Sequence, residues 1–231
     1  MPTSRRDFLG RLASSSVLLG AAPSVLAALP SSLHDSANDG ATNSAPTAWN
    51  LKWAASLTGL HKVVVDCAEI DDGGGIFRAS VWAKDYMEVM GATPAQLNTV
   101  LVLRAKAIPL ALNQAFWDAY GIGKKNGVKN PITEQPTTRN PALMNSKVDK
   151  TPPEFDDIAI DRFMKRGGIA LACSVAFGEM IAMVQAHDKL SEAAATEKAT
   201  KMLIPGVILQ PSGVFAVVRA QQAGCRYVHG S

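Results

Sequence analysis

Three cysteines carry the side chains of this sequence that are best suited to nucleophilic chemistry: Cys67, Cys173 and Cys225. A cysteine reacts as its thiolate, and the partial positive charge at a helix N-terminus lowers the pKa of a thiol held there. Cys173 ends the apolar run "IALAC" and directly precedes the helical pattern "SVAFGEMIAMVQAH". Two interpretations stay open. Cys173 is a working thiol for sulfur or disulfide exchange, or it is a small hydrophobic residue that fills the core.

The other two cysteines favour structural roles. Cys67 lies in the stretch "VVVDCAEIDD", where neighbouring carboxylates raise the pKa of a thiol. Cys225 follows Gly224 in a terminal strand pattern and is expected to be packed. An odd number of cysteines leaves at least one outside any intramolecular disulfide, and the sequence does not reveal a pairing. Because no C-x-x-C motif and no paired His and Cys spacing occurs, we expect no metal site and no cofactor.

A second candidate site is the glycine run Gly73, Gly74 and Gly75, in "DDGGGIF". Backbone N–H groups at the start of a helix form a cradle for anions. The run lacks the G-x-G-x-x-G spacing and the following Lys-Ser or Lys-Thr pair that mark nucleotide-binding loops. Ligand binding at these glycines and a tight turn without a ligand therefore both fit the pattern.

The elements that would position these residues alternate between strands and helices. Short apolar runs rich in β-branched residues predict strands, and apolar residues at helical spacing predict the helices between them. The predicted strands lie within 61–69, 97–107, 169–173, 206–210 and 225–228. The predicted helices lie within 76–90, 109–121, 154–168, 174–187, 191–203 and 211–224, with Pro109 in a first turn, Ser212 as a cap, and Gly91 and Gly121 as stops.

This alternation predicts a single α/β domain, with a parallel sheet of about five strands and helices on both faces. In such sheets the ligand site lies beyond the carboxyl ends of the strands. Cys173 falls at that edge, which is the reason for its interest.

One segment departs from the pattern. Residues 124–153 are polar and rich in proline, and a stretch of this length without regular structure is unusual in a compact domain. Three interpretations are equally open: a lid, an arm that wraps a neighbouring subunit, or a disordered insertion.

The N-terminal residues predict an export signal. Arg5 and Arg6 stand in "SRRDFLG", followed by a mildly apolar run and by "VLA", which suits a signal peptidase. We interpret residues 1–27 as a twin-arginine signal peptide and residues 28–58 as a flexible leader with a short helix in "WNLKWAASLTG". The domain then occupies 59–231. The expected location is the periplasm, with the twin-arginine translocase as a partner during export.

Charge and hydropathy exclude two classes of partner. Removal of the signal takes away three arginines and one aspartate, which lowers the formal net charge from +3 to +1. A nearly neutral chain gives no electrostatic case for nucleic acid. The signal is too short and interrupted to span a bilayer, and no other segment is long enough, so no membrane span is expected after cleavage.

The chain resembles the DsrE/DsrF-like family. The resemblance lies in "LIPGVILQPSGVFAVVRAQQAGCRYV", in "GGIALACSVAF" and, as a pattern, in "HKVVVDCAE" and "LNTVLVLRAKAIPLAL". It implies a compact α/β fold and a homo-oligomer, commonly a trimer or a hexamer. It also places Cys173 at the position of the cysteine that carries sulfur as a persulfide in the sulfur-relay members.

Two main hypotheses follow, beside a third possibility, a redox accessory protein for an exported enzyme. The first is an exported DsrE-like protein that binds or transfers sulfur through Cys173. The alternative is a non-catalytic periplasmic protein that binds a small ligand or assists assembly, with its ligand near Gly73, Gly74 and Gly75 and the 124–153 segment.

Overall fold

The computed structural model describes residues 49–149 and 151–231. The proposed signal peptide with Arg5 and Arg6, and the first part of the expected leader, lie outside the described residues. The described part of the chain forms one compact unit.

Five parallel strands form a single sheet in the order β4-β3-β2-β1-β5. The strands are β1 (His61–Cys67), β2 (Leu97–Leu103), β3 (Ile169–Cys173), β4 (Ile208–Gln210) and β5 (Arg226–His229). Strands β1 to β4 lie within segments for which the sequence predicts a strand, and β5 extends one residue beyond its predicted segment 225–228. The prediction of a parallel five-stranded α/β sheet is confirmed.

Helices and short 3-10 segments connect the strands. The α-helices of the described residues are α2 (Lys52–Ala55), α3 (Gly74–Met90), α4 (Gln114–Tyr120), α5 (Ile122–Lys125), α6 (Ser146–Asp149), α7 (Ile160–Lys165), α8 (Ser174–Asp188), α9 (Glu192–Lys201) and α10 (Gly213–Gln222). The 3-10 segments are η2 (Asp71–Gly73), η3 (Pro94–Gln96), η4 (Ala105–Ala111), η5 (Pro141–Leu143) and η6 (Pro153–Ile158).

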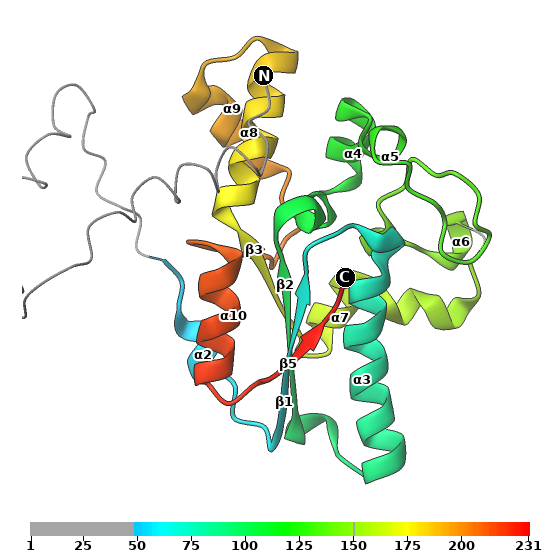
Figure 1. Ribbon diagram of the computed structural model, residues 1–231. Coiled ribbons are helices and arrows are strands. Elements are labelled where there is room, and N and C mark those ends of the chain that lie inside the picture. The colour runs from blue at the N-terminus through cyan, green and yellow to red at the C-terminus, as the bar shows by residue number, and fades with distance from the viewer. Residues whose placement is uncertain (1–48, 150) are drawn as a thin grey trace, which may run out of the picture. The chain divides into compact units, whose positions relative to one another are not determined.

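The strand order determines which face each helix covers. Strands β1 to β4 step across the sheet in one direction, whereas β5 returns to the far side of β1. Because such crossovers are right-handed, the helices that connect β1 to β4 cover one face and α10 covers the other. Figure 1 shows α3 and α7 on one side of the sheet, and α10 with α2 on the opposite side. The expectation of helices on both faces is confirmed.

Two hydrophobic clusters, one on each face, hold the layers together. Alternate residues of a strand point to opposite faces. Val63, Val65 and Leu101 pack in the cluster beneath α3, α4, α7 and α8. Val64 and Val100 pack on the other side, with α10 and with Trp53 of α2. Helix α2, which the sequence analysis places in the leader, is therefore part of the core on that face.

Several predicted helix caps are confirmed, whereas the predicted starts of two helices are wrong. Gly91 and Gly121 end α3 and α4 in the left-handed conformation, and the Ser212 hydroxyl accepts the N–H of Phe215 at the start of α10. Pro109, however, lies in η4 and not in the first turn of α4. The chain is extended after η4, and α4 begins at the cap residue Asn113.

The 154–168 helix also differs from its prediction. It is divided into η6 and α7, because Ala159 between them is extended. Helix α7 is thereby reduced to 6 residues.

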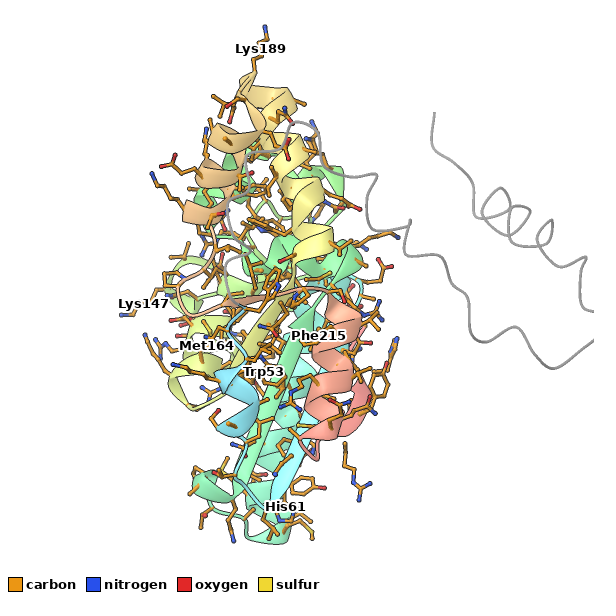
Figure 2. The ribbon with its side chains drawn as sticks, turned by 90° about the vertical axis from the view of Figure 1, so that its left-hand side faces the viewer. Trp53, His61, Lys147, Met164, Lys189 and Phe215 are labelled. Carbon is orange, nitrogen blue, oxygen red and sulfur yellow. The ribbon has the colours of Figure 1, made fainter. Side chains whose placement is uncertain are left out.

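Helices α8 and α9 form a hairpin that projects beyond the carboxyl edge of the sheet. Figure 2 shows Lys189, in the turn between them, at one end of the domain and His61, which begins β1, at the other. The Asp188 carboxylate accepts hydrogen bonds from Lys198 of α9 (2.8 Å) and from the hydroxyl of Tyr120 of α4 (2.6 Å). These bonds, that from Lys198 above all, hold the pKa of Asp188 well below its usual value.

The proline-rich segment is folded against its own domain over residues 124–149 and 151–153. Asn140 is fully buried, and its Nδ2 group donates hydrogen bonds to the carbonyl oxygens of Leu112 (2.7 Å) and Leu110 (3.4 Å). The N–H of Lys129 donates to the carboxylate of Asp72 at 2.8 Å. Buried hydrogen bonds of this kind are not those of a disordered insertion. A lid and an arm toward a second subunit stay predictions.

Candidate functional site

Polar side chains follow the carboxyl edge of the sheet, with one on or directly after each strand. They are Asp66 of β1, Arg104 after β2, Cys173 of β3, Gln210 of β4 and Tyr227 of β5. Tyr227 lies near the start of β5, opposite Val64, and its hydroxyl reaches Asp66. We call these five residues the carboxyl-edge row. Parallel strands bring residues that are far apart in the sequence to one edge, which is where ligands bind in open α/β sheets.

An ion pair holds the middle of the row. Arg104 donates from Nε to Oδ1 of Asp66 at 2.6 Å and from Nη2 to Oδ2 at 2.9 Å. The hydroxyl of Tyr227 donates to the same Oδ2 at 3.1 Å. The Asp66 side chain is only 5% exposed, whereas that of Arg104 is 31% exposed. A buried carboxylate is thus compensated by a bidentate partner that still reaches solvent.

The pKa values of both partners of Asp66 are raised. The hydrogen bonds to Asp66 are the main cause for Arg104, and Cys173 makes a smaller contribution in the same direction. Burial is the main cause for Tyr227, followed by the charge of Asp66. Arg104 therefore stays positively charged, and it interacts electrostatically with Cys173.

Helix α10 approaches Arg104 closely. A Cβ atom added to Gly213, the first residue of α10, would lie 2.5 Å from Cβ and 2.7 Å from Cδ of Arg104. Glycine at this position lets the arginine side chain pass beside the first turn of the helix. The positively charged end of α10 is thus near the same part of the carboxyl-edge row.

Cys173 occupies the junction that the sequence predicts for it. It is the last residue of β3 and the N-cap of α8, in an extended conformation. Its Sγ accepts a hydrogen bond from the N–H of Ala176 at 3.4 Å. The positive end of the α8 dipole therefore lies at this sulfur.

The Cys173 residue is almost completely buried. Cys173 is 6% exposed and packs in the cluster that contains Ala176 and Phe177. Val175, two residues further on, is 71% exposed, so the first turn of α8 itself lies at the surface. The geometry leaves both interpretations of Cys173 open: a capped thiolate near solvent, and a packed thiol.

The other two cysteines are buried thiols. Burial, followed by the charge of Asp66, raises the pKa of Cys67 to about 12. Burial raises the pKa of Cys225 to about 11, although Lys62 opposes the shift. All three cysteines are free, so none of them forms a disulfide with another. Cys67 and Cys225 have the surroundings of structural cysteines.

Protein contacts account for the three glycines of the "DDGGGIF" run. A Cβ atom would lie 2.8 Å from Cβ of Pro141 at Gly73 and 2.5 Å from the carboxylate of Asp71 at Gly74, and it would collide with Sγ of Cys67 at Gly75. Gly73 is also in the left-handed conformation, with φ 88°. Backbone conformation and packing thus require glycine at Gly73 and Gly75 without a ligand, whereas at Gly74 the exposed side chain of Asp71 could move aside. Ligand binding at Gly73, Gly74 and Gly75 stays a prediction.

A cavity of about 460 Å³, which the sequence analysis does not predict, lies on the other side of the sheet from α10. We call it the α3–α7 cavity. Its lining residues come from α3, β2, η6, α7 and the turn before β3: Phe77, Ala79, Ser80, Val81, Ala83, Lys84, Met87, Thr99, Phe155, Phe163, Arg166 and Gly168. One signal could have indicated it. The sheet-facing side of the predicted helix contains Ala79 and Ala83, which are too small to fill the space against a sheet.

The described residues contain no group of three His, Cys, Asp or Glu side chains that could hold a metal ion. Among the helices of the same residues, none is long and apolar enough to cross a membrane.

Comparisons of the chain with protein-family models, with curated proteins and with solved structures find no significant match. The resemblance to the DsrE/DsrF-like family stays a prediction.

The ion pair gives a prediction about stability. Arg104→Met removes the cation that compensates the buried carboxylate of Asp66, so we expect the free energy of unfolding to fall by about 3 kcal/mol. Urea denaturation at neutral pH measures the change. The double variant Asp66→Asn with Arg104→Met leaves no buried charge and should recover part of the loss. A loss below about 1 kcal/mol in the single variant would contradict this account.

The buried thiols predict a pH dependence. The pKa values of Cys67 and Cys225 in the folded protein exceed the ordinary value of 9.0. The native state therefore keeps these protons where the unfolded state loses them, and their contribution to stability is lost as the pH rises from about 9 toward 12. Urea denaturation under reducing conditions should show a smaller alkaline decline in Cys225→Ala than in the wild type. An identical decline would show that Cys225 does not titrate as described.

Proposed function

We propose that this chain is an exported DsrE-like protein that carries sulfur on Cys173. The position of the Cys173 Sγ atom supports the proposal. It accepts a hydrogen bond from the first turn of α8, and it is close enough to Arg104 to affect the pKa of that residue. Two sources of positive potential, the first turn of α8 and Arg104, thus lie near this sulfur at the edge where ligands of parallel sheets bind.

The proposed step is an exchange between sulfur atoms. The Cys173 thiolate attacks the terminal sulfur of a donor persulfide, R–S–SH, and forms a new S–S bond. The S–S bond of the donor breaks, and its electron pair leaves with the donor sulfur as R–S⁻. Cys173 then holds a persulfide that an acceptor thiolate can take by the same exchange. No outside oxidant or reductant is needed.

Arg104 suits the binding of an anionic donor. Asp66 accepts hydrogen bonds from Nε and Nη2, while Nη1 has no hydrogen-bond partner within the described part of the chain. Because the side chain is 31% exposed, Nη1 is available to a carboxylate of the donor. The ion pair with Asp66 fixes the guanidinium in place before a donor arrives.

The proposal includes a homo-oligomer, a trimer or a hexamer, as the family resemblance implies. Apolar side chains on α10 and on the adjacent edge strand β5 support it. Val214 and Val218 of α10 are 67% and 47% exposed, and Tyr227 of β5 is 46% exposed. Figure 2 shows Phe215, at the start of α10, on the same helix. Exposed apolar residues gathered on one helix and one sheet edge are typical of protein interfaces.

The alternative function is non-catalytic ligand binding or assembly in the periplasm. The low exposure of Cys173 favours it, since a sealed thiol would not meet a donor. The reactivity of Cys173 therefore separates the two functions.

Incubation with a low-molecular-weight persulfide tests the proposal. Mass spectrometry of the wild type should show an added mass of about 32 Da, one sulfur atom as a persulfide. Cys173→Ser should not take up the sulfur, whereas Cys225→Ser, which removes a buried thiol, should keep it. The absence of the adduct in the wild type, or its persistence in Cys173→Ser, would favour the non-catalytic alternative.

Export is tested separately. Replacement of Arg5 and Arg6 by lysine should leave the protein in the cytoplasmic fraction, because the paired arginines are the recognition element of the twin-arginine pathway. Immunoblots of the periplasmic and cytoplasmic fractions measure the distribution. An unchanged periplasmic share would contradict the proposed route.

A further inference from the structure

The α3–α7 cavity exists because the helical layer does not cover the whole sheet. Helix α7 has only 6 residues, and α3 turns Ala79 and Ala83 toward the space. Thr99 of β2 lines the cavity and is 6% exposed, so the cavity reaches the face of the sheet. Figure 1 shows α3 and α7 on the same side of the sheet.

Aromatic and aliphatic side chains make most of the lining. Phe77 of α3 and Phe155 of η6 have nearly parallel rings, with centroids 6.2 Å apart and an interplanar angle of 14°. Phe163 lies against Gly168, where an added Cβ would meet the ring at 2.5 Å. Phe77 and Met87 are 42% and 39% exposed. A volume of about 460 Å³ is within the range of small-molecule sites, which are mainly apolar with a few polar groups.

One polar atom in the lining has no partner among the described residues. The Oγ of Ser80 is covered, and it makes no hydrogen bond with this part of the chain. An unsatisfied buried hydroxyl costs about 1 to 3 kcal/mol, and such a group calls for an explanation. Rotation about the Cα–Cβ bond would turn this hydroxyl toward a ligand in the cavity.

Among the described residues, Lys84 and Arg166 are the charged side chains of the lining. Arg166 already has a partner of its own, so we take Lys84 as the cation for a ligand. Lys84 also pairs with Glu88 at 3.7 Å, but both side chains are more than half exposed, and such pairs are weak. A ligand with a negative group at the rim therefore fits the electrostatics of the cavity.

We propose that the α3–α7 cavity binds a small amphiphilic anion, an aromatic carboxylate or sulfonate. Its rings contact Phe77, Phe155 and Phe163, and its anionic group lies toward Lys84. Cys173 does not line this cavity, so the site is independent of the proposed sulfur chemistry.

Two fluorescent probes with the same aromatic body test the proposal on the full chain. Anilinonaphthalene sulfonate carries the anionic group, and phenylnaphthylamine lacks it. We expect saturable binding of both at one site per chain, with the sulfonate bound more tightly. Absence of saturable binding of the sulfonate would overturn the proposal.

Matched variants separate the apolar and the charged contributions. Ala83→Phe places a ring in the cavity from a half-buried position and should weaken both probes by at least about tenfold. Lys84→Gln should weaken the sulfonate by about threefold to tenfold and leave the neutral probe unchanged. Lys201→Gln is the control, because Lys201 is equally exposed and has a similar pair with Glu197 on α9.

The outcomes are distinct. Unchanged sulfonate binding in Ala83→Phe, with the circular dichroism of the wild type, would place the probe elsewhere and overturn the proposal. Equal effects of Lys84→Gln and Lys201→Gln would overturn the anionic part. Loss of the persulfide adduct in Cys173→Ser bears on neither result.

Discussion

Burial of the central strands on both faces is the constraint on which the rest of this structure depends. The last five residues of β1 and of β2 are all buried. Strands of this kind are stable only when helices cover both sides of the sheet, since an uncovered face would leave apolar side chains in water. The strand order then assigns α10 to one face and the helices between β1 and β4 to the other.

The same constraint creates the carboxyl-edge row. When all strands run in parallel, the residues that end them meet at one edge, and polar groups there can remain near solvent while the strands stay dry. Asp66 lies just inside that edge, and Arg104 lies just outside it. Their ion pair joins β1 to β2 at the place where α10 begins and where the electrostatic surroundings include Cys173. The row is therefore both a structural connection and the candidate site.

The two candidate sites differ in how the fold produces them. The carboxyl-edge row follows from topology, because any parallel sheet gathers its strand ends. The α3–α7 cavity follows from a local break, since extended Ala159 divides a helical segment and leaves α7 short. The short α7 and two alanines of α3 thus border the cavity.

The sequence by itself determined the alternation of strands and helices, the parallel sheet and the junction at Cys173, because these follow from hydrophobic period and from local caps such as Ser212 and Gly121. It also favoured a structural role for Cys67 through its acidic neighbours. Only the tertiary structure decided that Arg104, Asp66 and Tyr227 form one network, that Asn140 ties the proline-rich segment to the domain, and that small residues on α3 face a cavity. The physical reason is distance along the chain. A local sequence pattern determines which secondary structure a short segment prefers. Which residues meet when they are up to 161 positions apart depends instead on how the whole sheet packs.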